Sequence, residues 1–144
     1  MSFYRIFFII IGCLVFLYLL FILVLFILSR SGKWHQLAKT YQTTYVPPKE
    51  KIIKNQLGQF NLIQYRYSLI VGFLDEGLYI SVDKIFSMFH PPLLIPWSKI
   101  KNVKKAKAGG FFRYATMEID GVKVSLAQEH YDEIINHLTN YQQN

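Results

Sequence analysis

Charged and apolar residues divide the chain into two unequal parts. Residues Ile6–Leu28 form a run of 23 residues without a charged side chain. A helix of this length, at about 1.5 Å per residue, reaches roughly 34 Å, which exceeds the bilayer's hydrocarbon core of about 30 Å. The run is too long for a signal peptide, whose apolar stretch is about 7 to 15 residues, and no small-residue cleavage site follows it. The pattern therefore predicts a retained transmembrane anchor over residues 1–30.

Basic residues beside the run predict its orientation. Arg5 stands alone on the N-terminal side, whereas Arg30, Lys33 and Lys39 follow the run closely, with Trp34 among them as an interfacial aromatic residue. Positively charged flanks remain on the cytoplasmic side of a membrane. We therefore expect a single-pass protein whose C-terminal part faces the cytoplasm. Its juxtamembrane segment is expected to contain Arg30, Lys33, Trp34 and Lys39.

Residues 31–55 are expected to form a juxtamembrane helix and a linker. Trp34, Leu37, Ala38 and Tyr41 recur at i, i+3, i+4 and i+7, the spacing of one helix face, and the pair at 47–48 is Pro-Pro, which ends a helix. This face either packs on the following domain or lies in the lipid headgroup layer, where each nearby Lys or Arg gains about 1 kcal/mol. The spacing alone does not decide between the two.

From about Gly58 to Leu126 the pattern changes to short apolar strands separated by turns. A turn over residues 75–77, with Gly77 at positive φ, would pair Leu74 with Leu78, Gly72 with Ile80 and Ile70 with Val82. A two-residue turn at 109–110 would pair Ile100 with Ile119, Lys101 with Glu118, Lys105 with Tyr114 and Lys107 with Phe112. A turn at 120–121 would pair Ile119 with Val122, Met117 with Val124 and Ala115 with Leu126. All three registers leave one apolar face to be buried.

A C-terminal amphipathic helix is expected to cover that face. Tyr131, Ile134, Ile135 and Leu138 stand at helical spacing, and acidic residues precede or open the segment. A sheet in so short a chain needs its inner face and edges covered. We expect a mainly β domain over residues 56–144, an antiparallel partial barrel closed by this helix.

Two segments resemble a known family. They are Gly72-Phe-Leu-Asp-Glu-Gly-Leu-Tyr-Ile-Ser81 and His90-Pro-Pro-Leu-Leu-Ile-Pro-Trp-Ser-Lys-Ile100, the second with an Ile-Pro-aromatic-x-x-Ile step. They are similar to PH-like domains of the GRAM type, and the chain from about 30 to 140 resembles small bacterial membrane proteins with one anchor and one such domain. The resemblance implies a bacterial inner (cytoplasmic) membrane location and a noncatalytic domain that binds lipids, peptides or proteins. The first hairpin offers only Arg66 as a basic residue, so recognition of phosphoinositides is not expected.

A basic hairpin tip is the first candidate site. Five lysines lie within residues 99–107, and the tip itself combines cations and aromatic rings suited to an anionic membrane: Lys105, Lys107, Phe111, Phe112 and Arg113. The alternative is a solvated strand face whose lysines prevent edge-to-edge pairing.

A proline-rich segment is the second candidate, for contact with a partner protein. His90, Pro91 and Pro92, together with Trp97, would form a stiff, partly apolar surface, and Phe86, Met88 and Phe89 before it would leave an exposed apolar patch. The alternative is a stiff connection whose Trp97 anchors the core.

Composition narrows the function further. The formal net charge is +7, and much of the excess lies beside the anchor, so anionic lipid explains it without nucleic acid. A single cysteine and four scattered histidines offer no metal site, and no nucleophile or phosphate-binding motif appears, so neither a catalytic residue nor a cofactor is expected. The expected function is a noncatalytic interaction module for membrane lipids, anionic headgroups among them, another membrane protein or a second copy; the alternative is an accessory subunit of a larger membrane complex.

The basic tip generates a direct prediction. Replacing Lys105, Lys107 and Arg113 together with Gln should weaken binding of the domain to vesicles of anionic lipid, because three headgroup-attracting charges are lost, each contributing about 1 kcal/mol. Cosedimentation with the vesicles measures the effect. Unchanged binding would eliminate the tip as a lipid contact.

Overall fold

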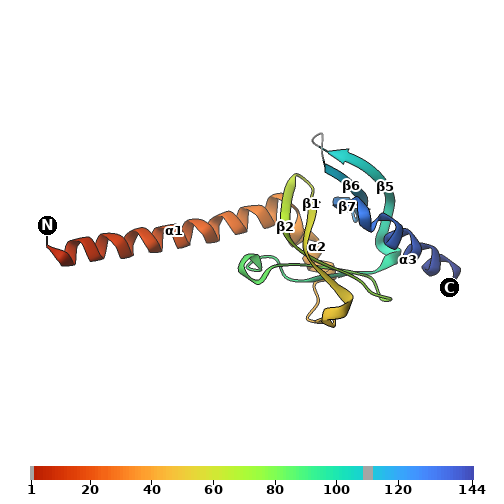
Figure 1. Ribbon diagram of the computed structural model, residues 1–144, viewed down its shortest axis with the longest axis horizontal. Helices are drawn as coiled ribbons and strands as arrows, with labels where there is room; N and C mark the ends of the chain where they lie inside the picture. The colour runs from red at the N-terminus through yellow and green to blue at the C-terminus, as the bar shows by residue number, and fades with distance from the viewer. Residues whose placement is uncertain (1, 109–111) are drawn as a thin grey trace.

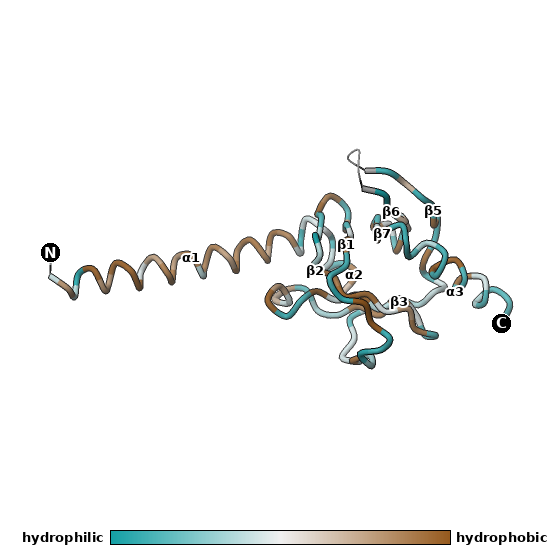
Figure 2. Tube along the Cα trace, viewed as in Figure 1, coloured by the Kyte–Doolittle hydropathy of each residue, from teal (hydrophilic) through white to brown (hydrophobic). Residues whose placement is uncertain are grey.

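The computed structural model describes residues 2–108 and 112–144, except for the side chains of Ala108 and Phe112. Helix α1 (Phe3–Ser31) projects from a compact β-rich part, and the two chain termini lie at opposite ends of the molecule (Figure 1). Hydrophobic residues predominate along the projecting helix (Figure 2). By length and composition α1 can cross a membrane.

The domain contains one antiparallel sheet, two shorter α-helices and several three-residue 3₁₀ turns. The helices are α2 (Trp34–Tyr41) and α3 (Tyr131–Gln143). The strands are β1 (Ile52–Phe60), β2 (Ile63–Phe73), β3 (Leu78–Val82), β4 (Leu93–Ile95), β5 (Ile100–Ala108), β6 (Phe112–Ile119) and β7 (Val122–Ala127). Their order across the sheet is β4-β3-β2-β1-β7-β6-β5. The expected antiparallel sheet with a closing C-terminal helix is confirmed.

Strand β1 joins the two halves of the sheet, because it pairs with β2 and, through residues 58–60, with β7. Register shifts interrupt the β1–β2 ladder, and Asn55 and Tyr67 have positive φ angles of 55° and 54°. Bulges of this kind bend a ribbon and increase its twist. Gly58 lies at the bend, where a Cβ atom would run into the Leu69 side chain. The bent ribbon lets the sheet curl into a half-barrel.

The predicted register of the last hairpin is confirmed. Ile119 pairs with Val122 and Met117 with Val124, as the Asp-Gly pair at 120–121 indicated. Both turn residues have positive φ angles, 47° and 78°. These angles belong to the type I′ turn that two-residue hairpins prefer, so here the local sequence sets the pairing.

The predicted register of the β2–β3 hairpin is wrong by one residue. Gly72 pairs with Tyr79 rather than Ile80, and Gly77 does not have a positive φ. Leu74 and Gly77 instead exchange backbone hydrogen bonds of 3.0 and 3.3 Å, which makes residues 75–76 the turn. Gly77 lies immediately before β3, where the carbonyl of Ile95 leaves no room for a Cβ atom. A glycine is therefore required here because the chain passes close to the backbone of β4, and not because the turn needs a positive φ.

The predicted β5–β6 register holds only at its start. Lys101 pairs with Glu118, but a register shift follows, and Asn102 within it has a φ of 54°. Lys105 is therefore opposite Ala115 and Lys107 opposite Arg113, not opposite Tyr114 and Phe112. A one-residue shift exchanges the two faces of a strand. Lys105 and Lys107 thus share the face of the buried Ala115, and the expected turn at 109–110 lies outside the described residues.

Helix α2 packs into the core of the domain. All four residues of its predicted apolar face are buried, and Trp34 is fully buried. The Trp34 ring lies 4.5 Å from that of Phe60, and its Nε1 donates a 2.9 Å hydrogen bond to the Pro91 carbonyl. At the other end of α2, the Tyr41 hydroxyl donates to Asp120 in the β6–β7 turn. Of the two alternatives for this face, the structure shows the domain-packed one.

Helix α3 closes the open end of the half-barrel. Ile134 is fully buried against the core. His137 stacks on the Trp97 ring at 4.7 Å with an angle of 5° between the planes, and Trp97 Nε1 donates to the Leu74 carbonyl at 2.8 Å. Trp97 therefore ties α3 to the β2–β3 turn.

Burial of Trp34 makes α2 necessary for the fold. Trp34→Ala should lower the free energy of unfolding of the full chain by about 3 to 5 kcal/mol, because it opens a large cavity and removes a buried hydrogen bond. Urea unfolding in mild detergent, followed by circular dichroism, measures the change.

The matched control is Gln36→Ala on the exposed side of the same helix. It should change the stability by about 0.5 kcal/mol or less. Equal effects of the two substitutions would mean that α2 contributes only as a helix and not through the core.

Candidate membrane-contact site

The corner between α1 and α2 holds the long helix in one direction. Gly32 lies against the tip of the β1–β2 hairpin, where a Cβ atom would come within 3.4 Å of Ile63 Cβ and of the Phe60 carbonyl oxygen. Lys33 follows with a left-handed φ of 59°. Asn61 Nδ2 donates to the Ser31 carbonyl at 3.1 Å and so caps the last turn of α1. The corner is thus clasped by the hairpin tip.

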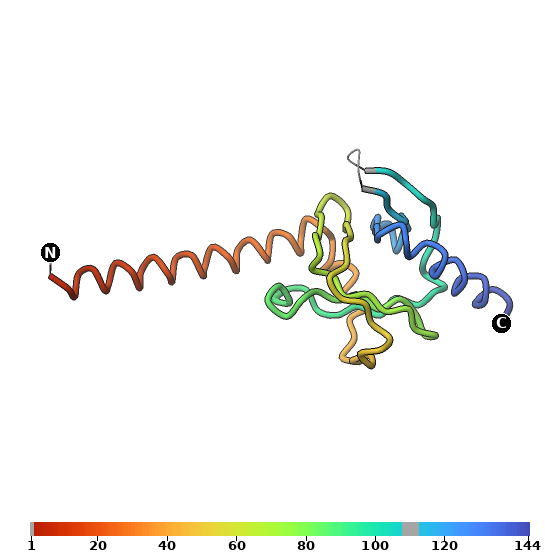
Figure 3. Tube along the Cα trace, viewed as in Figure 1, coloured from red at the N-terminus to blue at the C-terminus, as the bar shows by residue number. Residues whose placement is uncertain are grey.

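A second segment fixes α1 from the side. Residues 84–90 form a loop, green in Figure 3, that reaches back from the domain along α1. Ser29 Oγ donates to the Phe89 carbonyl at 2.7 Å. Ring centroids lie 5.4 Å apart for Phe26 and Phe89, and 6.3 Å apart for Phe21 and Phe86. The loop therefore accompanies at least the last three turns of the helix.

The base of this loop is anchored by a buried histidine. His90 is 1% exposed; its Nδ1 lies 3.0 Å from the Met88 carbonyl, and its Nε2 lies 2.9 Å from the Tyr65 hydroxyl. A carbonyl only accepts, so Nδ1 carries the hydrogen and neutral Nε2 accepts from Tyr65. Burial lowers the pKa of His90, and the hydrogen bond to Met88 opposes this only in part. Burial also raises the pKa of Tyr65, so the neutral pair is the stable one.

A small cavity of about 170 Å³ lies between α1 and the sheet. Leu25 and Leu28 line it from the helix, and Phe86 lines it from the loop. The other lining residues are Ile63, Gln64, Tyr65, Arg66, Ser68 and His90. Although several of these residues are polar, most of the surface that they expose to the cavity is apolar, which suits hydrocarbon better than a polar ligand.

The predicted juxtamembrane residues lie at the end of the domain that is next to α1. Arg30 is exposed with its guanidinium 5.1 Å above the Phe26 ring, Lys33 is half-buried in the corner, and Lys39 is exposed on α2. Trp34 is the exception, since it is fully buried in the core and is not an interfacial aromatic. Helical spacing put Trp34 on the apolar face, but only tertiary packing shows what that face contacts.

The predicted lipid-contacting tip is only partly described. Lys105 Nζ lies 4.9 Å from the Tyr131 ring, so this lysine extends toward the start of α3. Lys107 and Arg113, both exposed, are directly opposite each other. Phe111 and the side chain of Phe112 lie outside the described residues. Two cations in one cross-strand pair repel each other, and an anion between them would relieve that repulsion.

The predicted partner-contacting residues are mostly internal. His90 and Trp97 are 1% and 3% exposed, so their side chains are not available to a partner. Pro91 and Pro92 are half-buried, and their carbonyls accept from Trp34 and from the Thr43 amide. The exposed apolar surface lies in the preceding loop, as proposed for Phe86, Met88 and Phe89, and Ile85 extends it.

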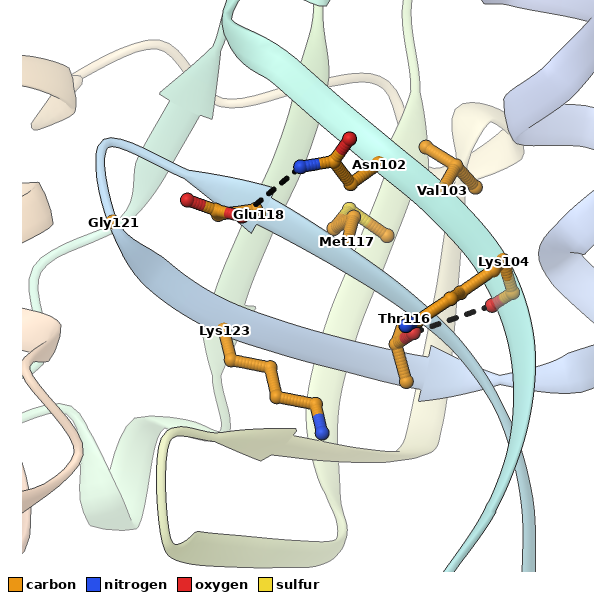
Figure 4. Close-up of a pocket in the computed structure, with 8 residues that line it drawn as sticks. All are labelled: Asn102, Val103, Lys104, Thr116, Met117, Glu118, Gly121 and Lys123. Atoms are coloured by element: carbon orange, nitrogen blue, oxygen red, sulfur yellow. Dashed lines mark hydrogen bonds between the residues drawn. The ribbon is translucent and has the colours of Figure 1, made fainter.

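A hollow of about 580 Å³ lies elsewhere, over β5, β6 and β7 (Figure 4). Asn102 donates to Glu118 at 3.1 Å, and the Thr116 hydroxyl donates to the Lys104 carbonyl at 3.4 Å. The Thr116 hydroxyl thus points its hydrogen at a carbonyl rather than at a base that could activate it. The arrangement suits a solvated sheet face.

Comparisons with known proteins leave the GRAM-type resemblance a prediction. No family model matches the chain, and no curated protein and no solved structure matches it.

His90 makes stability depend on pH. The unfolded chain takes up a proton near the ordinary pKa of about 6.5, whereas the folded chain resists it. The free energy of unfolding should therefore fall as the pH drops below about 6.5, since the unfolded state binds more protons there. Urea unfolding in detergent at about pH 7.5 and about pH 5.5 measures this.

The variant His90→Gln isolates this contribution, because His130 is also buried with a lowered pKa and remains in place. The variant should be less stable near neutral pH by about 1 to 3 kcal/mol, through loss of buried hydrogen bonds. It should also lose less stability on acidification than the natural chain. An unchanged pH dependence would contradict the role assigned to His90.

Proposed function

We propose that the chain is a single-pass protein of the bacterial inner membrane, whose PH-like domain faces the cytoplasm as a noncatalytic module for anionic lipid headgroups. The observation that carries the proposal is that α1 and the domain are joined by a clasped corner and a side contact rather than by a loose linker. If α1 spans the bilayer, these contacts hold the domain on the membrane surface.

The fold supports the PH-like assignment. A bent antiparallel sheet in the order β4-β3-β2-β1-β7-β6-β5, closed at one end by a C-terminal helix, is the architecture that the resemblance implied. The Ile-Pro-Trp step leads from β4 into β5, as the resemblance also implied. These features define the shape of the domain, whereas its ligand depends on the charged side chains at its surface.

The distribution of charge supports an anionic membrane as the ligand. Cationic side chains lie where the domain meets α1: Arg30 and Lys33 at the corner, Arg66 beside the cavity and Lys84 on the loop. A hollow of about 490 Å³ near the β2–β3 turn and α3 is lined by four carboxylates and one lysine: Glu50, Asp75, Glu129, Glu133 and Lys51. Helix α3 lies away from α1 (Figure 1). A membrane with anionic headgroups attracts the first end and repels the second.

Orientation provides the test. Alkaline phosphatase fused after Asn144 should be inactive in a bacterial host, green fluorescent protein fused there should fluoresce, and the chain should remain in the membrane fraction after an alkaline carbonate wash. The reason is that the cations following α1 keep their side of the helix in the cytoplasm. An active phosphatase fusion or release by carbonate would refute the proposal.

A charge variant serves as the matched control. Arg30, Lys33 and Lys39 replaced together by Gln leave Arg5 as the nearest cation, so a fraction of the molecules should insert in the opposite orientation. Phosphatase activity of that fusion should rise above that of the natural chain.

The size of the extracted protein distinguishes the lipid-binding module from the alternative, an accessory subunit of a larger complex. Extraction in mild detergent followed by size-exclusion chromatography should yield a lone protomer or a small homo-oligomer if the domain acts on lipid. Elution within a stable larger complex would favour the accessory role.

A further inference from the structure

The loop at residues 84–89 lies at a depth along α1 that water does not reach if the helix spans a bilayer. A bilayer core requires about 20 helical residues, and every window of about that length within Ile6–Leu28 contains Phe21. Phe21 then lies about 6 to 10 Å inside the hydrocarbon boundary, at about 1.5 Å per residue. The Phe86 ring, with its centroid 6.3 Å from that of Phe21, lies beside this part of the helix. Phe89, beside Phe26, lies near the boundary itself.

The exposed side chains of the loop suit this depth. Ile85, Phe86, Met88 and Phe89 are 74%, 37%, 43% and 42% exposed on the chain alone. Four exposed apolar residues within five positions form a contiguous patch next to an apolar helix, and such patches mark contact with a membrane or a protein. Continuity with α1 identifies the medium as the lipid around that helix. Lys84 can extend its ammonium to the headgroups while its stem stays among the chains.

Several polar groups of the loop form hydrogen bonds within the loop itself, as an apolar medium requires. The amides of Phe86, Ser87 and His90 donate to carbonyls within residues 83–87, at 2.8, 3.3 and 2.9 Å. Ser87 Oγ donates to the Lys84 carbonyl at 2.7 Å. Polar groups paired within their own segment lower the cost of leaving water. The base is held by His90 and by the Trp34 bond to Pro91, so the depth of the loop relative to α1 is set by the core.

We infer that residues 84–89 enter the acyl-chain region of the leaflet next to the domain, as a shallow second membrane element beside α1. This inference rests on the proposed spanning by α1. The ligand of the loop is the hydrocarbon of membrane lipids, not a headgroup and not a second protein. Two inserted elements fix the rotation and the tilt of the domain on the membrane, which one helix alone does not.

Site-specific fluorescence measures the depth. The full chain carrying Cys13→Ser receives one cysteine at a time, as Leu17→Cys, Ile85→Cys or Tyr141→Cys, and each is labelled with a nitrobenzoxadiazole dye. All three positions are exposed on the chain, so the substitutions spare the core. The proteins are reconstituted into vesicles of phosphatidylcholine and phosphatidylglycerol containing nitroxide lipids, with the nitroxide either near the glycerol or near the chain end, and iodide serves as the aqueous quencher.

The expected pattern differs at each position. The label at Leu17, in the middle of the apolar run, should be quenched most by the deep nitroxide. The label at Ile85 should emit at shorter wavelength than the label at Tyr141 and be quenched most by the shallow nitroxide, with little quenching by iodide. The label at Tyr141 should be quenched by iodide alone.

The outcomes separate this inference from the proposed function. If Leu17 is quenched by lipid but Ile85 is quenched by iodide like Tyr141, α1 spans and the inserted loop is refuted. If Ile85 is protected from nitroxide lipid and iodide alike, a protein surface covers the loop, and the lipid assignment is also refuted. If Leu17 itself is not quenched by lipid, the spanning helix fails and the loop inference fails with it.

Discussion

Burial of Trp34 is the interaction on which the arrangement of this molecule depends. Its ring packs on Phe60 and Tyr65 and edge-on to His90, and its indole nitrogen bonds to the carbonyl of Pro91. One side chain thereby joins α2, the β1–β2 hairpin and the base of the 84–90 loop. A large aromatic ring fully removed from water contributes several kcal/mol, with cavity cost added if it is removed, so these elements hold their positions together.

This packing fixes the long apolar helix α1 and the β-rich domain relative to each other. Because α2 packs in the core, only Gly32 and Lys33 separate α1 from the domain. The hydrogen bond from Asn61 to Ser31 and the hydrogen bond from Ser29 to the loop hold this corner in place. A flexible tether would let a domain sample many orientations. Here the direction of α1 and the face of the domain beside it are fixed with respect to each other, which in the proposed orientation presents the cationic end to the lipid headgroups.

The sequence predicted correctly those elements that depend only on neighbouring residues. A run of uncharged residues by itself indicates a helix long and apolar enough to cross a membrane. The spacing of the four apolar residues in α2 matches the residues that are buried, and an Asp-Gly pair adopts the positive φ angles of the β6–β7 turn. The registers that failed depend on distant contacts. Gly77 looked like a turn glycine, yet it is required by the approach of Ile95 on β4. The register shift at Asn102 is a bulge that a pairing counted from the turn alone does not reveal.

The sequence by itself determined the long apolar helix, the strand-rich middle, the closing helix and the exposure of apolar residues before the His-Pro-Pro segment. Tertiary structure alone decided that Trp34 faces the core and not the membrane, that Lys105 and Lys107 share the face of Ala115, and that residues 84–89 lie beside Phe21 and Phe26. The physical reason is the same in each case. Periodicity states which side of an element is apolar, whereas the object that covers that side is set by contacts between residues far apart in the chain.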